Sequence, residues 1–243
     1  SARALALRGL AHEPEPARYV RAVRSGLREL HPTVLDAAIE TGVRLGLPDA
    51  WSRARQRAED GDGHASLLLL GLRGEPDDQA AIFAAVQDRK RRLAALRALG
   101  CLGTAAAVDT ALEWLDDKLA GPLAGEVFST VTSVDLENAH MTSTPEEKEA
   151  LEHRPEDDLP RPNPMAVLQW WMSHRERFTD GRFVEGAPRA QSSLERVLVH
   201  GRMRQRASAL LSLQLASRPG TFARYRIQTR APTSRQRTQI CSQ

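Results

Sequence analysis

Apolar residues recur at helical rather than strand spacing along most of the chain. Five apolar segments begin roughly thirty residues apart, a spacing that is typical of helical-repeat proteins. Each of them predicts the first helix of a repeat; they are Ala2–Leu10, Pro32–Leu45, His64–Leu72, Arg91–Leu99 and Pro122–Val131. The third contains four consecutive leucines, and a helix so apolar must be covered by neighbours on several sides.

A short break and a second, amphipathic helix follow each of the first four segments. The breaks are rich in Gly, Pro, Asp and Thr, which end one helix and begin the next; they are 13–16, 46–49, 74–77 and 100–104. One face of the second helices is apolar, with Val20, Val23, Leu27 and Leu30 in the first and Val108, Ala111, Leu112 and Leu115 in the fourth. Stacked pairs of this kind share one interior, so the pattern predicts an all-α superhelix, or solenoid, over residues 1–134.

The pattern changes after residue 134. Residues 135–163 form an acidic, proline-rich insertion, in which a capping box at Thr144–Glu147 predicts a helix to about His153 and residues 156–162 are expected to be extended. Residues 164–243 are predicted to be a C-terminal helical extension with an arginine-rich tail. Its expected elements are helices over 164–178, 192–200 and 202–217 and a small extended piece at Arg182–Val184.

Composition supports helix and does not indicate export. Ala, Leu and Arg dominate over β-branched residues, and the formal net charge is only +3. Charge is uneven, because ten arginines and no acidic residue follow Glu195. Two distant cysteines, no leader-like pattern and no apolar run of membrane length lead us to expect a cytoplasmic protein that does not associate with membranes. The chain begins inside a helical pattern, so we expect a further segment upstream, although a short cap before Ser1 would give the same pattern.

Segment 91–112 resembles a known repeat. Its sequence from Arg91 to Gly103, followed by Ala107-Val108 and Ala111-Leu112, is similar to the short HEAT-like repeat of phycobilisome lyase subunits. The resemblance covers residues 2–134 and implies a HEAT-like fold; it says little about function, because such repeats serve as scaffolds, as adaptors and in a few enzymes.

The order of features over most of the chain resembles a proteobacterial family of HEAT-like proteins. These features are the repeats, the acidic loop Asp157–Pro160, Trp170-Trp171 with Arg175 and Phe178, Arg182-Phe183 with Gly186, and Gly201 before Arg204 and Arg206. Members of that family tend to be encoded beside type VI secretion genes, including those for spike-tip and adaptor proteins. The resemblance implies an accessory or adaptor role with a secretion-system component as protein partner, and it implies no catalytic residue.

Candidate partner-binding residues lie in the C-terminal extension. Trp170 and Trp171 share a stripe with Val167, His174 and Phe178, and tryptophan is frequent at the centre of interfaces. The alternative, which the apolar spacing favours, is that both indoles fill the core. Arg175, which the family resemblance singles out, and Arg202, Arg204 and Arg206 complete the candidate set. The last three could follow a phosphate backbone, although a solvated cationic face is the favoured interpretation.

Catalytic patterns do not emerge. His174 lacks a second ligand at helical spacing, zinc-binding cysteine pairs are missing, and we recognise neither a phosphate-binding glycine loop nor a nucleophile elbow. A HEAT-like di-iron hydroxylase would need several His-Glu pairs, and only His12-Glu13 occurs. We therefore expect a non-enzymatic scaffold or adaptor without metal or cofactor. A HEAT-type nucleic-acid-binding protein or DNA glycosylase remains the main alternative, and a chromophore-handling lyase subunit a weaker one.

Overall fold

The protein is all-α. The computed structural model describes residues 2–11, 16–61, 63–73, 75–143 and 155–216. Within these ranges the α-helices are α1 (Ala2–Leu10), α2 (Val20–Gly26), α3 (Pro32–Arg44), α4 (Pro48–Glu59), α5 (His64–Arg73), α6 (Pro76–Gln87), α7 (Arg92–Leu102), α8 (Ala105–Leu112), α9 (Gly121–Thr132), α10 (Pro164–His174), α11 (Gln191–His200) and α12 (Met203–Ala216). The 3-10 helices are η1 (Pro16–Tyr19), η2 (Pro155–Asp158) and η3 (Arg175–Phe178), and one antiparallel hairpin joins β1 (Phe183–Val184) to β2 (Ala187–Pro188).

Local chemistry explains where many helices begin. Proline occupies the first turn of α3, α6, α9 and α10, where its missing N–H costs nothing. The Thr104 hydroxyl accepts from the Ala107 N–H at the start of α8 (3.1 Å), and Asn163 accepts from the Ala166 N–H at the start of α10 (3.3 Å). These side chains satisfy N–H groups that the first helical turn leaves without a partner.

All five predicted first helices are present, as α1, α3, α5, α7 and α9, and their ends differ from expectation by at most three residues. Two predictions in the repeat region are wrong. Helix α7 continues through Gly100 to Leu102, because the left-handed cap falls on Gly103 (φ 70°). Leu30 lies beyond α2 and is 94% exposed, so it does not extend the apolar face of that helix.

The chain forms two compact units. One comprises the described residues of 1–56 together with those from Ala190 onward, and the other is Arg57–Arg189. In the first unit, α3 packs against α1 and α2, and α12 packs against α11 and contacts α3. Helix α11 begins one residue before its predicted start at residue 192: Ala190 is its N-cap residue, and the Ser193 hydroxyl accepts from the Ala190 N–H.

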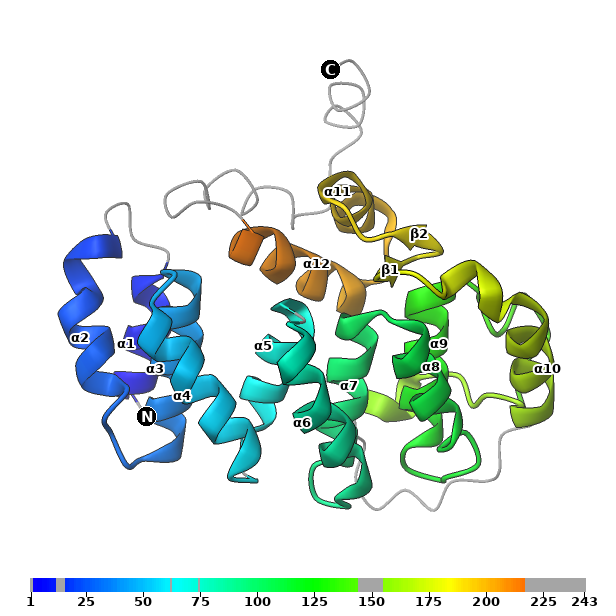
Figure 1. The fold of residues 1–243 in the computed structure, drawn as a ribbon, viewed down its shortest axis with the longest axis horizontal. Coiled ribbons are helices and arrows are strands. Elements are labelled where there is room, and N and C mark those ends of the chain that lie inside the picture. Colours follow the sequence, from blue (N-terminus) through cyan, green and yellow to red (C-terminus); the bar gives the residue numbers. More distant parts are fainter. Residues whose placement is uncertain (1, 12–15, 62, 74, 144–154, 217–243) are drawn as a thin grey trace. The chain divides into compact units, whose positions relative to one another are not determined.

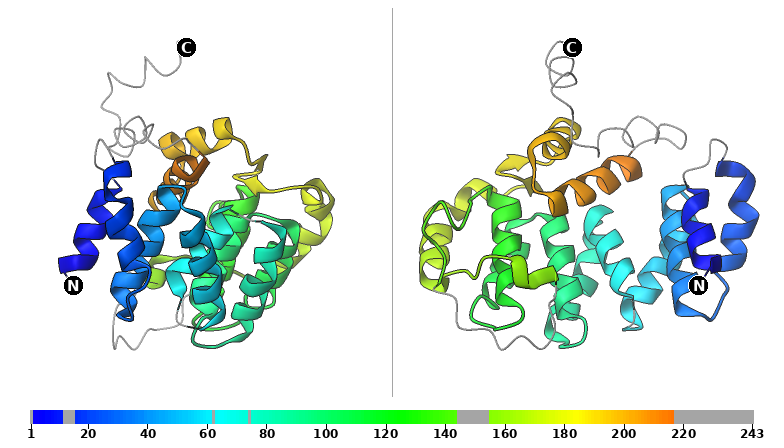
Figure 2. Two further views of the ribbon diagram at one scale, coloured as in Figure 1. Left: turned by 60° about the vertical axis from the view of Figure 1, so that its left-hand side comes forward. Right: turned by 180° about the vertical axis from the view of Figure 1, so that it is seen from behind.

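Successive helix pairs stack in the unit Arg57–Arg189 (Figures 1 and 2). Helix α7 contacts α5 on one side and α9 on the other, and it also packs against α6 and α8. Leucine side chains fill this interior: Leu67, Leu70, Leu96, Leu99 and Leu123 are each at most 1% exposed. Gly71 lets α5 and α7 approach closely, since a Cβ there would lie closer than 3.0 Å to the Ala98 carbonyl oxygen.

The β1–β2 hairpin covers the C-terminal ends of α7 and α9. Its two-residue turn, Glu185-Gly186, has positive φ at both positions (47° and 72°), as a type I′ turn requires. Three backbone N–H groups of the hairpin donate to helix-terminal carbonyls: Phe183 to Gly103 (2.7 Å), Glu185 to Thr130 (2.7 Å) and Gly186 to Val131 (2.9 Å). The hairpin thus supplies donors to carbonyls that the helices themselves leave unsatisfied.

Two largely buried arginines, Arg182 and Arg189, likewise donate hydrogen bonds to carbonyls at the C-terminal ends of helices, including that of α5. The Arg182 guanidinium donates to carbonyl oxygens at the ends of two helices, namely those of Gly71, Leu72, Arg73, Cys101 and Leu102. Arg189 donates to the carbonyls of Leu72 and Cys101. Burial and the nearby charge of Arg189 lower the pKa of Arg182 to about 10, so the side chain still carries its charge at neutral pH. Positive charge at helix C-termini interacts favourably with the negative end of the helix dipole, and this interaction stabilises the junction.

The two described ends of the acidic insertion are joined to each other, and one residue of the insertion pairs with α7. Thr142 and Pro162 form an isolated β-bridge, and the Asn163 N–H donates to the Met141 carbonyl (2.7 Å). The expectation that residues 156–162 are extended is wrong at the start, because Pro155–Asp158 is a 3-10 helix. Its Glu156 is 6% exposed and forms an ion pair with Arg97. The helix predicted to begin at Thr144 lies outside the described residues.

Candidate functional site

Asp109 lies at the centre of a polar cluster that contains two of the predicted residues, Trp171 and Arg175. It lies on α8, which buries Ala107, Val108 and Ala111 against the stack and leaves the Asp109 side chain 39% exposed. Helix α10 lies beyond α8 and α9 in Figure 1, with Trp171 and Arg175 one turn apart. Because residues at i and i+4 share a helix face, both side chains reach the same carboxylate.

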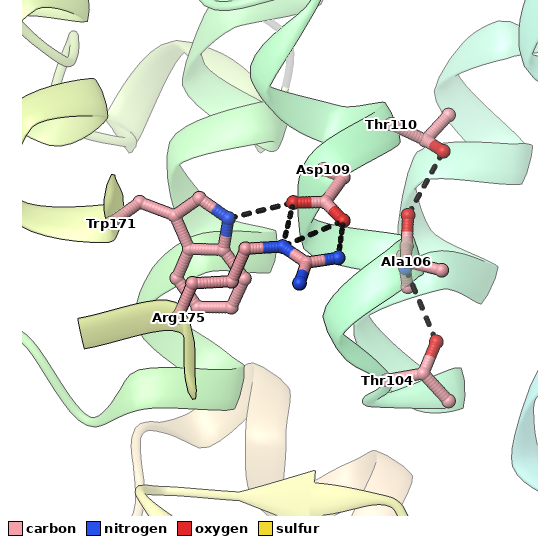
Figure 3. Close-up of polar contacts among 7 residues, drawn as sticks. Thr104, Ala106, Asp109, Thr110, Trp171 and Arg175 are labelled. Atoms are coloured by element: carbon pink, nitrogen blue, oxygen red, sulfur yellow. Dashed lines mark hydrogen bonds and ion pairs between the residues drawn. The ribbon is translucent and has the colours of Figure 1, made fainter. Parts of the chain in front are cut away.

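Both side chains donate to Asp109 (Figure 3). The Trp171 indole N–H donates to Oδ1 (2.7 Å), while Arg175 donates from Nε to Oδ1 (3.0 Å) and from Nη2 to Oδ2 (2.6 Å). Burial of Asp109 opposes its ionisation, but the hydrogen bonds from Arg175 and Trp171 outweigh burial and lower its pKa. The hydrogen bonds that Arg175 donates to Asp109, and the charge of that carboxylate, raise the pKa of Arg175. Asp109 is therefore a fixed carboxylate that holds Arg175 in one orientation.

The inner face of α10 is an aromatic core. Trp171 is 3% exposed and Val167 is fully buried. The Phe128 ring of α9 makes edge-to-face contacts with Trp170 and Trp171, at centroid distances of 5.2 and 6.5 Å. The interpretation of Trp171 as a core residue is confirmed, since this side chain is buried and supports the helix from inside.

Trp170 and His174 form the edge of this core. Both are half-buried, and their rings stack with a centroid distance of 4.2 Å and an interplanar angle of 10°. The His174 ring nitrogen Nδ1 also lies 2.8 Å from the Trp170 carbonyl oxygen. These contacts account for His174 without a metal ion.

The outer face of α10 exposes an apolar stripe that the sequence analysis did not select. Met165 is 76% exposed, Leu168 36% and Met172 81%. Their spacing of i, i+3 and i+7 places them along one side of the helix, away from Val167 and Trp171. The sequence already shows that α10 is apolar around most of its circumference, which indicates that some apolar residues could remain exposed. We refer to Met165, Leu168 and Met172 as the α10 stripe.

The arginines at 202, 204 and 206 belong to the other compact unit. Arg202 is exposed just before α12, whereas Arg204 and Arg206 are half-buried on that helix. The Arg206 Nε donates to the Gly201 carbonyl (2.6 Å), so this guanidinium helps to fix the turn between α11 and α12. The candidate residues thus divide into an aromatic and arginine group around α10 and a basic group at the start of α12.

The described residues contain no group of three His, Cys, Asp or Glu side chains that could hold a metal ion. None of the helices that the structure describes has both the length and the hydropathy needed to span a bilayer. No protein-family profile, curated protein or solved structure matches this chain. Helix α10 and the residue after it combine a rigid aromatic base, an exposed apolar stripe and an oriented cation.

Proposed function

We propose that this protein is a non-enzymatic interaction scaffold or adaptor of the bacterial cytoplasm, and that it holds a protein partner on the α10 stripe. The observation that carries the proposal is the contrast between the two faces of α10. The inner face is fixed by Val167 and Trp171, while the outer face presents Met165 and Met172 to solvent. Large side chains exposed in a row on a well-anchored helix are typical of helix-mediated recognition.

Stacking of helix pairs in Arg57–Arg189 supports the further proposal that residues 1–134 are a HEAT-like solenoid. The resemblance of the chain to the family encoded beside type VI secretion genes suggests the class of partner. We propose that the protein is an accessory of such a system and that a secretion component occupies the stripe. Methionine suits this role because its flexible thioether adapts to different partner surfaces.

Met172→Glu is expected to abolish co-purification of a secretion component from the native host, because a charge on the stripe would have to be desolvated on binding. The measurement is quantitative mass spectrometry of proteins captured by the tagged chain. Met203→Glu is the matched control, since Met203 is 73% exposed but lies on α12 in the other unit. If both variants lose the secretion component equally, or if neither loses it, the α10 stripe is not the binding surface.

The nucleic-acid alternative makes a separate prediction at Arg202, Arg204 and Arg206. Because Arg206 already donates to the Gly201 carbonyl, we expect replacement of all three by Gln to leave duplex DNA binding weak and unchanged at physiological salt. Fluorescence anisotropy over a salt series measures this. Tight, salt-dependent binding by the wild type that the triple variant loses would instead favour a nucleic-acid function.

A further inference from the structure

Arg175 continues the α10 stripe by one turn. Leu168, Met172 and Arg175 are spaced i, i+4 and i+7, and the Arg175 backbone is still helical (φ −54°, ψ −37°). The Arg175 side chain is 46% exposed, so the cation at the end of the apolar row is in contact with solvent. Three apolar positions followed by one cation therefore form a directional surface.

One edge of the Arg175 guanidinium is hydrogen-bonded to Asp109, and another edge is available to a further acceptor. Its Nε and Nη2 atoms donate to Asp109, and no described residue accepts a hydrogen bond from Nη1. A guanidinium has five N–H donors in a planar fork, so those of Nη1 and the second of Nη2 remain for a further acceptor. Because Asp109 already fixes the side chain, a second carboxylate would bind without the usual cost of ordering an arginine.

We propose that the partner presents an amphipathic helix whose apolar row lies on Met165, Leu168 and Met172 and ends in a carboxylate that pairs with Arg175. This inference rests on the proposed function and specifies the chemistry of its partner. The apolar row provides contact area, and the ion pair sets the direction of the partner helix and rejects a helix that places a cation at that end. The length of the stripe, two turns between Met165 and Met172, matches a short helix.

The test uses the full chain and a phage-displayed library of peptides of about four helical turns. Peptides are selected on the wild type and depleted on Met172→Glu. We expect the enriched peptides to share apolar residues at helical spacing followed by Asp, Glu or a free C-terminal carboxylate. Fluorescence anisotropy should then show that Arg175→Gln weakens binding about tenfold, as loss of a charge-assisted hydrogen-bonded pair predicts.

A double-mutant cycle isolates the ion pair. Replacing the peptide Glu by Gln should weaken binding to the wild type but change nothing further on Arg175→Gln. Arg177→Gln, an exposed arginine two residues away, is the matched control and should bind like the wild type. Circular dichroism checks that each variant is folded. We expect folded variants because the ion pair between Arg175 and Asp109 is partly exposed and contributes little to stability.

The outcomes separate the inference from the proposed function. Peptides that need Met172 but bind Arg175→Gln equally well would overturn the carboxylate pairing and leave the interaction surface standing. Failure to recover any peptide that distinguishes the wild type from Met172→Glu would overturn both. Concentration-dependent dimerisation in sedimentation velocity that Met172→Glu abolishes would show that a second copy of the chain, rather than an acidic helix, covers the stripe.

Discussion

Arg182→Met is expected to lower the free energy of unfolding by about 3–5 kcal/mol, the range for removing one partner of a buried charged network. The substitution removes every donor that this guanidinium supplies to the ends of α5 and α7. Some of those carbonyls would remain buried without a donor, and the two helix dipoles would lose a nearby cation. Urea denaturation followed by tryptophan fluorescence measures the change, since Trp114, Trp170 and Trp171 all lie in the same unit as Arg182.

The control for this prediction is the same substitution at an exposed site. Arg177→Met should change the free energy of unfolding by less than about 0.5 kcal/mol, because Arg177 is exposed on η3. Arg182→Lys should fall between the two, since it keeps the charge but loses the planar fork that reaches several carbonyls at once. If Arg182→Met is no more destabilising than Arg177→Met, the hairpin does not anchor these helix ends.

Gly71→Ala and Gly100→Ala are expected to change stability in opposite directions. An alanine Cβ at Gly71 would press on the backbone of Ala98 in the adjoining helix, so α5 and α7 would have to separate, at a net cost of about 1–3 kcal/mol. A Cβ at Gly100 would lie 3.8 Å from Val127, which is ordinary contact. There the substitution should stabilise α7 by about 0.5–1 kcal/mol, because alanine favours helix over glycine.

Both substitutions remove a helical glycine in the same unit, so differences in helix propensity cancel between them. The midpoint of urea unfolding, measured side by side, reports the sign of each effect. A stabilising Gly71→Ala would show that the close approach of α5 and α7 is not tightly packed.

The helices could be predicted from sequence because the signals that form them are local. Apolar spacing located α1, α3, α5, α7 and α9, and α11 begins one residue before its predicted start at residue 192. The errors also have local causes. The prediction placed the helix end at Gly100. The residue that takes the left-handed conformation is a second glycine three residues later, Gly103. Leu30 was placed on a helical face although α2 ends at Gly26.

The same reasoning from local sequence predicted only part of the candidate site. Apolar spacing identified Trp171 and Val167 as one stripe, but α10 is apolar around most of its surface, and periodicity alone does not say which side is covered. Packing of Phe128 against the indoles decides this, and it leaves Met165 and Met172 outside. Asp109 precedes Trp171 by 62 residues in the chain, so no local pattern could have paired them.

The amino-acid sequence by itself determined the all-α class, most helix ends and the small extended piece near Phe183, because hydrophobic period and capping act within a few residues. Tertiary structure alone decided which face of α10 is open, which carboxylate orients Arg175, and which carbonyls accept hydrogen bonds from Arg182. Those outcomes depend on groups brought together from distant parts of the chain, and their energies arise from burial and charge that exist only after the helices have packed.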